Sequence, residues 1–160
     1  MVNKLIKSEQ ERFYAAMGRF VIAWTDMEFC LDLVVLNGRK LKSPLPHQLS
    51  EKTNFVRKVL VPVLSPIHAT SVLRLIDEID ELAPTRHDYV HGAVIGHDIV
   101  RSKLTMSLTR MLQPSKKPRR KIVKVTTAEL LAIARRLREI ADDLLDLAEA
   151  ILHEERPCPN

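Results

Sequence analysis

The strongest constraint on the fold is an unbroken helical repeat of apolar residues near the end of the chain. Between Thr126 and His153, large apolar residues recur at steps of three and four: Leu130, Ile133, Leu137, Ile140, Leu144, Leu147 and Ile151. Such a stripe makes one face of an α-helix apolar, and that face must pack against other elements. Thr126 and Glu129 have the spacing of a capping box, which begins a helix. The sequence therefore predicts a long last helix.

A second stripe predicts a long first helix over Ser8–Asn37. Its apolar residues are Phe13, Met17, Phe20, Trp24, Met27, Leu31, Val34 and Val35. Asn37-Gly38 is typical of a left-handed helix end, and prolines follow it. A shorter helix is predicted over Leu49–Val61, with Ser50 as a candidate cap.

A third helix is expected to begin near Ser65-Pro66, because proline suits the first helical position. Pro84 removes a backbone donor inside this helix, so we expect a kink or a restart at Ala83-Pro84-Thr85. Gly92 then ends the helix.

The apolar period changes from helical to alternating after Gly92. Leu104, Met106 and Leu108 alternate with polar residues, and a β-branched run covers 122–125. We predict a small antiparallel sheet, with 93–95 as a third strand. The whole β-insertion covers residues 93–125 and includes an exposed basic loop from Gln113 to Lys121. Residues 154–160, with two prolines, are expected to form a frayed tail.

These elements predict one mainly all-α domain over residues 1–160. We expect an antiparallel up-and-down four-helix bundle with the small β-sheet inserted before the last helix. No stretch approaches the roughly 18 uncharged apolar residues of a membrane span, and the N-terminus lacks the pattern of a secretory signal. We therefore expect a cytoplasmic protein without a membrane partner. The spacing of Cys30 and Cys158 suggests neither a zinc site nor a disulfide framework.

The densest group of chemically active side chains is Arg86-His87-Asp88-Tyr89-Val90-His91. Here the chain resembles the HEPN superfamily, whose motif is an arginine followed after four to six residues by a histidine, usually with a polar residue directly after the arginine. Arg86, His87 and His91 match this motif. The order of elements is also similar, since a HEPN domain is a four-helix bundle with its motif near the end of the third helix.

The resemblance implies cleavage of RNA by a homodimer, without a metal or another cofactor, in a toxin or phage-defence system. Arg86 and His91 are then the catalytic residues, and the 2′-hydroxyl of the RNA attacks to leave a cyclic phosphate. Arginine can bind phosphate oxygens bidentately, and a histidine in the last helical turn is favoured as imidazolium. A cognate antitoxin or defence protein is a further candidate partner.

Four other residues are expected to support this site. They are His87, Asp88 and Tyr89, which lie within the motif, and Glu28, the acidic residue that intrudes on the stripe of the first helix. A carboxylate in that stripe needs a partner, so we expect Glu28 to reach Arg86 or His87, although an edge position in solvent is also open.

Basic residues of the predicted loop are candidates for binding RNA phosphates: Lys116, Lys117, Arg119, Arg120 and Lys121. The net charge of +5 agrees with an anionic partner.

Two other classes of function remain open. A helical bundle with these stripes also fits a non-catalytic module that dimerises or binds a nucleotide or a protein. His87 and His91 have the spacing of paired metal ligands and could join Glu28, but no third ligand follows at a recognisable interval, so we expect no metal site. Ala93 occupies the position at which HEPN toxins paired with a nucleotidyltransferase antitoxin carry a tyrosine, which argues against that pairing.

Overall fold

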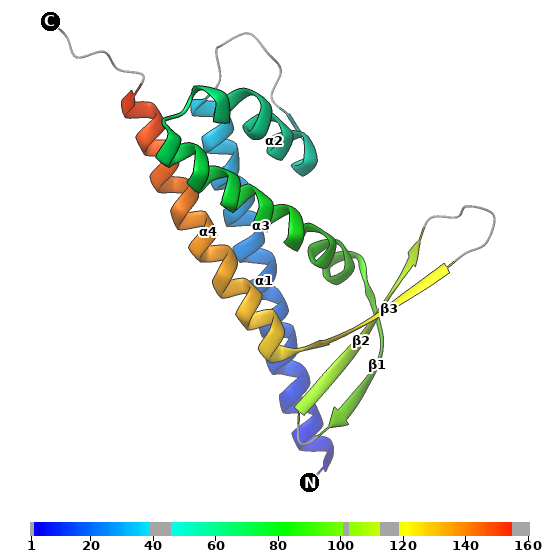
Figure 1. The fold of residues 1–160 in the computed structure, drawn as a ribbon. Coiled ribbons are helices and arrows are strands. Elements are labelled where there is room, and N and C mark those ends of the chain that lie inside the picture. Colours follow the sequence, from blue (N-terminus) through cyan, green and yellow to red (C-terminus); the bar gives the residue numbers. More distant parts are fainter. Residues whose placement is uncertain (1, 39–45, 101–102, 113–118, 155–160) are drawn as a thin grey trace, which may run out of the picture. The chain divides into compact units, whose positions relative to one another are not determined.

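The computed structural model describes residues 2–38, 46–100, 103–112 and 119–154, and these are mostly helical (Figure 1). The helices and strands are α1 (Val2–Asn37), α2 (Leu49–Phe55), α3 (Pro66–His91), β1 (Ala93–Val100), β2 (Lys103–Leu112), β3 (Arg119–Thr126) and α4 (Thr127–Glu154). A π-helical turn, Val56–Leu60, and a 3-10 turn, Val61–Val63, continue α2. The predicted set of four helices with a small sheet before the last one is confirmed for this part of the chain. Of the predicted tail, residues 155–160 lie outside the described residues.

The chain divides into two compact units. The first unit contains Met1–Ile22 and Ala83–Arg135, and the second contains Ala23–Leu82 and Arg136–Asn160. The three long helices each contribute residues to both units. None of the helices in the described segments combines the length and the apolarity needed to cross a membrane.

In the second unit, α3 and α4 pack in opposite directions. Arg136 forms a bidentate ion pair with Glu78, and Arg74 lies 3.4 Å from Asp143, so residue numbers rise along one helix as they fall along the other. The core between the helices consists of the predicted stripes: Met27, Leu31, Val34, Val35, Val72, Leu75, Ile76, Ile79, Leu137, Ile140, Leu144, Leu147 and Ile151 are all buried. Burial of these apolar side chains is the main stabilising contribution to this unit.

Two helix ends in the second unit differ from the prediction. Gln48, not Ser50, is the N-cap of α2, and the carboxylate of Glu51 accepts the backbone N–H groups of His47 and Gln48 at 3.1 and 3.2 Å. The first helix ends at Asn37 as predicted, but Gly38 is not left-handed. Its backbone N–H donates to the Val34 carbonyl oxygen, and a Cβ there would collide with the Leu60 side chain. A larger residue at this position would therefore require the Leu60 side chain to move.

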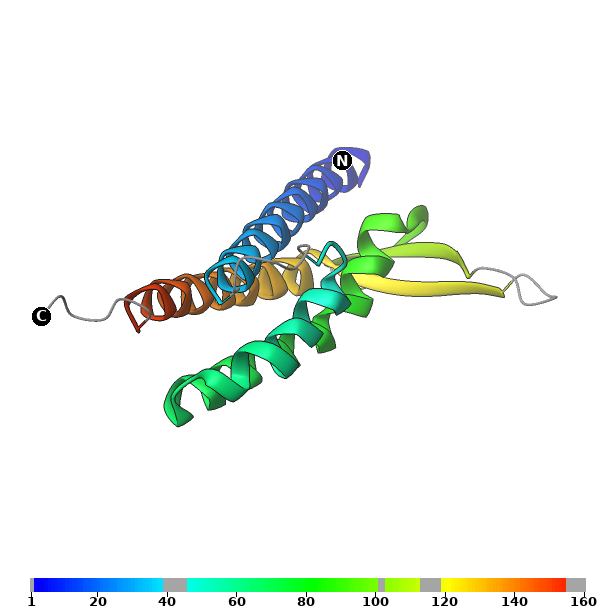
Figure 2. The same cartoon turned by 90° about the horizontal axis from the view of Figure 1, so that it is seen from above.

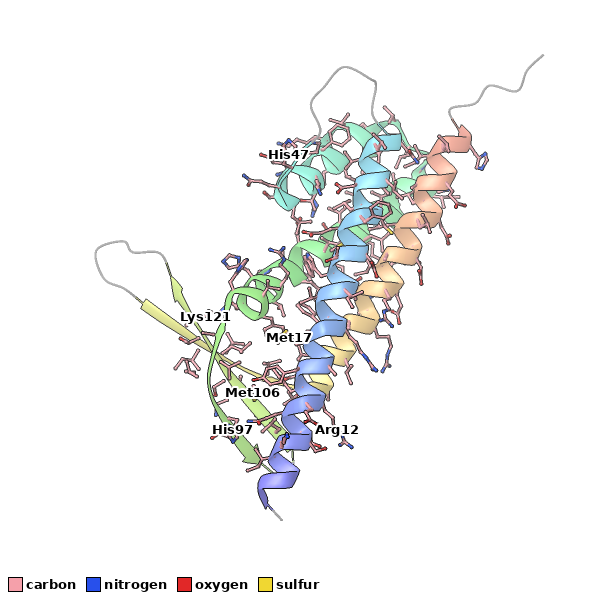
Figure 3. The ribbon with its side chains drawn as sticks, turned by 180° about the vertical axis from the view of Figure 1, so that it is seen from behind. Arg12, Met17, His47, His97, Met106 and Lys121 are labelled. Atoms are coloured by element: carbon pink, nitrogen blue, oxygen red, sulfur yellow. The ribbon has the colours of Figure 1, made fainter. Side chains whose placement is uncertain are left out.

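The first unit contains the sheet, whose strands follow the order β1-β2-β3 and are all antiparallel. Figure 2 shows β2 and β3 running side by side. Leu104, Met106 and Leu108 are buried, and the polar residues between them are not, which confirms the predicted alternation. Paired residues of neighbouring strands share a face, so Val125 lies on the buried face opposite Met106. Figure 3 shows this face of the sheet, with Met106 labelled, turned toward the N-terminal half of α1.

The predicted β-insertion is more ordered than expected. The strand predicted at 93–95 extends from Ala93 to Val100, with a bulge between Val94 and Gly96. Strand β3 begins at Arg119, so the last three residues of the predicted basic loop belong to it.

The predicted start of α4 is confirmed. Thr126 and Glu129 form the reciprocal capping box, in which each backbone N–H donates to the other side chain at 2.7 and 3.2 Å. Of the kink or restart predicted at Pro84, the restart is wrong, because the helix is continuous from Pro66 to His91. The kink stays a prediction.

The Glu78–Arg136 pair gives a prediction about acid stability. Hydrogen bonds from Arg136 lower the pKa of Glu78 below its ordinary value of 4.5. The pair therefore stabilises the fold above that ordinary value, and the contribution is lost as the pH falls through the lowered pKa. Glu78→Gln should reduce the free energy of unfolding by about 1 kcal/mol at neutral pH and by less below about pH 4. Urea unfolding across this pH range measures the difference, with exposed Glu81→Gln as the control. A Glu78→Gln deficit independent of pH would contradict the assignment.

Candidate functional site

The last two turns of α3 carry the predicted motif, and their rotation decides which side chains are accessible. Asp88 and Tyr89 are buried, whereas His87 and His91 are exposed. Arg86 lies between these two faces and is half-buried. All of these residues belong to the first unit.

An ion pair joins the motif to the sheet. Asp88, whose side chain is only 7% exposed, bonds to the ammonium group of Lys121 on β3. Side chains alternate between the two faces along a strand, so Lys121 lies on the same face of the sheet as Val123 and Val125. Its register partner on β2 is Arg110. The sequence placed Lys121 in a solvated loop and assigned it to RNA. Lys121 belongs to β3, not to a loop, and its side chain, which is 44% exposed, pairs with Asp88. Its binding to RNA stays a prediction.

Tyr89 is a packing residue on the buried side of the motif. Its ring contacts Phe20 edge to face, with 5.6 Å between the ring centroids. Burial raises the pKa of the Tyr89 hydroxyl, and the negative charges of Glu129 and Asp88 raise it further. Both effects favour the neutral phenol over the phenolate.

Gly92 ends α3 against the sheet. A Cβ at this position would collide with the Asp88 carbonyl oxygen and would lie 3.1 Å from the Cβ of Leu108 on β2. The chain thus passes closely between the helix end and the strand. The predicted stop at Gly92 is confirmed, and its cause is this close approach.

The accessible part of the motif offers one guanidinium and two imidazoles. The Nε atom of Arg86 is buried without a hydrogen-bond partner, and within the described residues of the first unit this guanidinium forms no ion pair. The rings of His87 and His91 touch edge to face, with centroids 4.8 Å apart. These groups can bind an anion or move a proton, since none of them is neutralised by a neighbouring carboxylate in this unit.

The charge of the chain is divided unequally between the two units. The segments of the first unit contain fifteen Lys and Arg residues against five Asp and Glu, a net charge of +10. Those of the second unit contain ten against fifteen, a net charge of −5. The modest overall charge of +5 therefore conceals a strongly basic unit that carries the motif. A polyanion would be attracted to this unit.

The remaining predicted site residues are placed as follows. Lys116 and Lys117 lie outside the described residues. Arg119 and Arg120 begin β3, and only their backbone is described. Glu28 is a half-buried residue of α1 in the second unit. Its contact with Arg86 or His87 stays a prediction.

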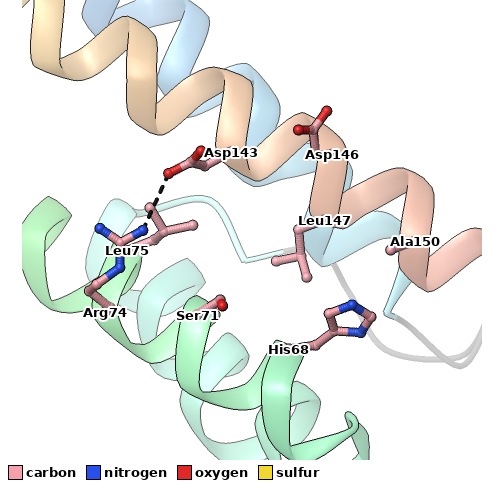
Figure 4. A pocket seen from close by; sticks show the side chains of 8 residues that line it. All are labelled: His68, Ser71, Arg74, Leu75, Asp143, Asp146, Leu147 and Ala150. Atoms are coloured by element: carbon pink, nitrogen blue, oxygen red, sulfur yellow. Dashed lines mark hydrogen bonds and ion pairs between the residues drawn. The ribbon is translucent and has the colours of Figure 1, made fainter.

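The second unit contains a cavity that the sequence did not indicate. Its volume is about 250 Å³, and it is lined by side chains of α3 and α4 (Figure 4): His68, Ser71, Arg74, Leu75, Asp143, Asp146, Leu147 and Ala150. The lining residues are about 70 positions apart in the sequence, so only the packing of the two helices brings them together. Arg74 and Asp143 partly neutralise each other across it.

Comparison of the chain with protein-family models, with curated proteins and with solved structures found no match.

The Asp88–Lys121 pair gives a second prediction. Lys121→Met keeps much of the side-chain volume but removes the ammonium group that bonds to the buried Asp88 carboxylate, so the fold should lose about 1 to 3 kcal/mol. Asp88→Asn should restore part of this loss in the double variant, because it removes the buried charge. Denaturant unfolding of the parent, both single variants and the double variant measures the coupling. Lys124→Met is the control, since Lys124 pairs with exposed Asp98. Additive effects of the two substitutions would show that the pair contributes nothing.

Proposed function

We propose that this protein is a metal-independent endoribonuclease of the HEPN type that acts as a homodimer, in a toxin or phage-defence system. The observation that carries the proposal is the composition of the accessible motif. Arg86, which has no ion-pair partner among the described residues of its unit, and exposed His91 lie at one helix end, inside a unit of net charge +10. RNA binding needs basic charge, and cleavage needs a proton donor beside a phosphate-binding group.

In this proposal Arg86 and His91 divide the chemistry between them. The Arg86 guanidinium binds the non-bridging phosphate oxygens and stabilises the extra negative charge of the transition state. The 2′-hydroxyl oxygen forms a new bond to phosphorus as the bond to the 5′-oxygen breaks. His91, as imidazolium, donates its proton to the leaving 5′-oxygen. The products are a 2′,3′-cyclic phosphate and a free 5′-hydroxyl.

Helix geometry supports the requirement for a second copy. Residues five apart diverge by roughly 140° around a helix, so Arg86 and His91 of one chain do not line one face. A two-fold partner that supplies the same pair would place Arg86 of one chain near His91 of the other. The proposal includes an up-and-down bundle arrangement of the helices, with the ends of α3 meeting at the dimer interface.

The catalytic proposal predicts a specific pattern of losses. Arg86→Ala and His91→Ala should each reduce RNA cleavage by about 100-fold or more, because each removes a group that acts on the reacting phosphate. His87→Ala should cost less. Cleavage should persist in a chelator, yield cyclic-phosphate ends and fail on DNA, which lacks the 2′-hydroxyl.

Exposed His97 on β1 provides the matched control, since His97→Ala should leave cleavage unchanged. Circular dichroism should show that all variants fold. If Arg86→Ala and His91→Ala remain as active as the parent, the catalytic assignment is wrong. If the pure protein cleaves no RNA but binds a partner protein tightly, the alternative function, a non-catalytic interaction module, replaces the ribonuclease proposal.

The dimer is predicted separately. Light scattering at micromolar concentration should give about twice the 18.3 kDa chain mass. Val90, which is 40% exposed beside the motif, would be covered in such a dimer, and Val90→Glu should shift the mass toward the monomer. A monomeric parent protein would remove the argument for a shared site.

A further inference from the structure

We propose that His87 and His91 form a bidentate site for a divalent transition-metal ion such as Zn²⁺, and that the ion inhibits the ribonuclease by occupying the His91 imidazole. The inhibitory part rests on the proposed function, whereas the metal site itself does not.

The separation of the two rings fits a shared ion. Zinc binds an imidazole nitrogen at about 2.0 Å, which places the ring centroid roughly 3.2 Å from the metal. Two rings on one ion then have centroids about 4.5 Å apart at a right angle and about 5.2 Å apart at the tetrahedral angle. The observed separation of 4.8 Å lies between these values. Only rotation of exposed side chains is needed to direct both nitrogens at one ion.

The backbone holds the pair in this position. Four residues apart on a helix, His87 and His91 lie on one face, the spacing that two histidines use to hold zinc in helical metal sites. The inward burial of Asp88 and Tyr89 fixes that face toward solvent. An ion can therefore reach both rings without any rearrangement of the helix.

The ligand count makes this site exchangeable. Among the described residues, no group of three or more His, Cys, Asp or Glu side chains is placed to hold a metal. Two imidazoles and water molecules complete the shell, so the ion binds more weakly than in a three- or four-ligand site. Imidazole prefers zinc, copper and nickel over magnesium or calcium, so Mg²⁺ should not compete.

Binding of Zn²⁺ removes His91 from the cleavage reaction. A metal-bound imidazole nitrogen cannot carry the proton that the leaving 5′-oxygen needs. Because the proposed reaction needs no metal, an ion on His91 would act as an inhibitor.

Isothermal titration of the full chain with Zn²⁺ tests the site without any substrate. His87→Ala and His91→Ala should each weaken zinc binding at least tenfold, because each leaves a single imidazole. His97→Ala, which removes an exposed histidine of the same unit, should not. MgCl₂ should give no binding heat. If either motif variant binds Zn²⁺ as tightly as the parent, the site is wrong.

A cleavage assay tests the inhibition. Zn²⁺ should inhibit the parent and His97→Ala, and chelator should restore activity. His87→Ala, compared with its own zinc-free rate, should need at least ten times more Zn²⁺ for the same inhibition. Equal inhibition of His87→Ala and the parent would overturn the regulatory role. If no protein cleaves RNA under any condition, the ribonuclease proposal fails, and calorimetry still decides the metal site.

Discussion

The ion pair between Asp88 and Lys121 helps to determine which side chains of the last turn of α3 are buried and which face solvent. An α-helix rotates about its axis as a rigid unit. The contact of Asp88 with β3 therefore also fixes the directions of the neighbouring side chains. Tyr89 is then buried against Phe20, and the two histidines face solvent. Gly92 allows the helix end to approach β2 closely enough for this contact. The proposed catalytic and metal-binding roles of His91 both depend on this one orientation.

The sequence predicted the elements that follow from periodicity and capping. The stripe after Thr126 defined α4 to within one residue of its observed end, and alternation around Met106 defined a strand with one buried face. These predictions succeed because a helix or strand must bury a face whose spacing is written directly in the chain. The capping box succeeds for the same reason, since both of its partners lie within four residues.

The failed predictions concern contacts between distant residues. Lys121 lies in a run of basic residues around two prolines, which suggested a loop, and nothing local identifies β3 as its element or Asp88 as its partner. Pro84 suggested a kink or a restart in α3, but the helix continues through it without a restart, so the low helix propensity of proline did not end the element. The cavity between α3 and α4 depends on two segments that local patterns cannot align. The motif residues could be identified in the sequence from their chemistry. Which of their side chains face solvent could not be predicted from it.

The unequal division of charge sharpens what the motif can do. A net charge of +10 over the segments of the first unit attracts a polyanion, and it also favours the proposed phosphate-binding role of Arg86. A divalent cation is repelled by the same positive charge, so the proposed metal site depends on joint ligation by both imidazoles.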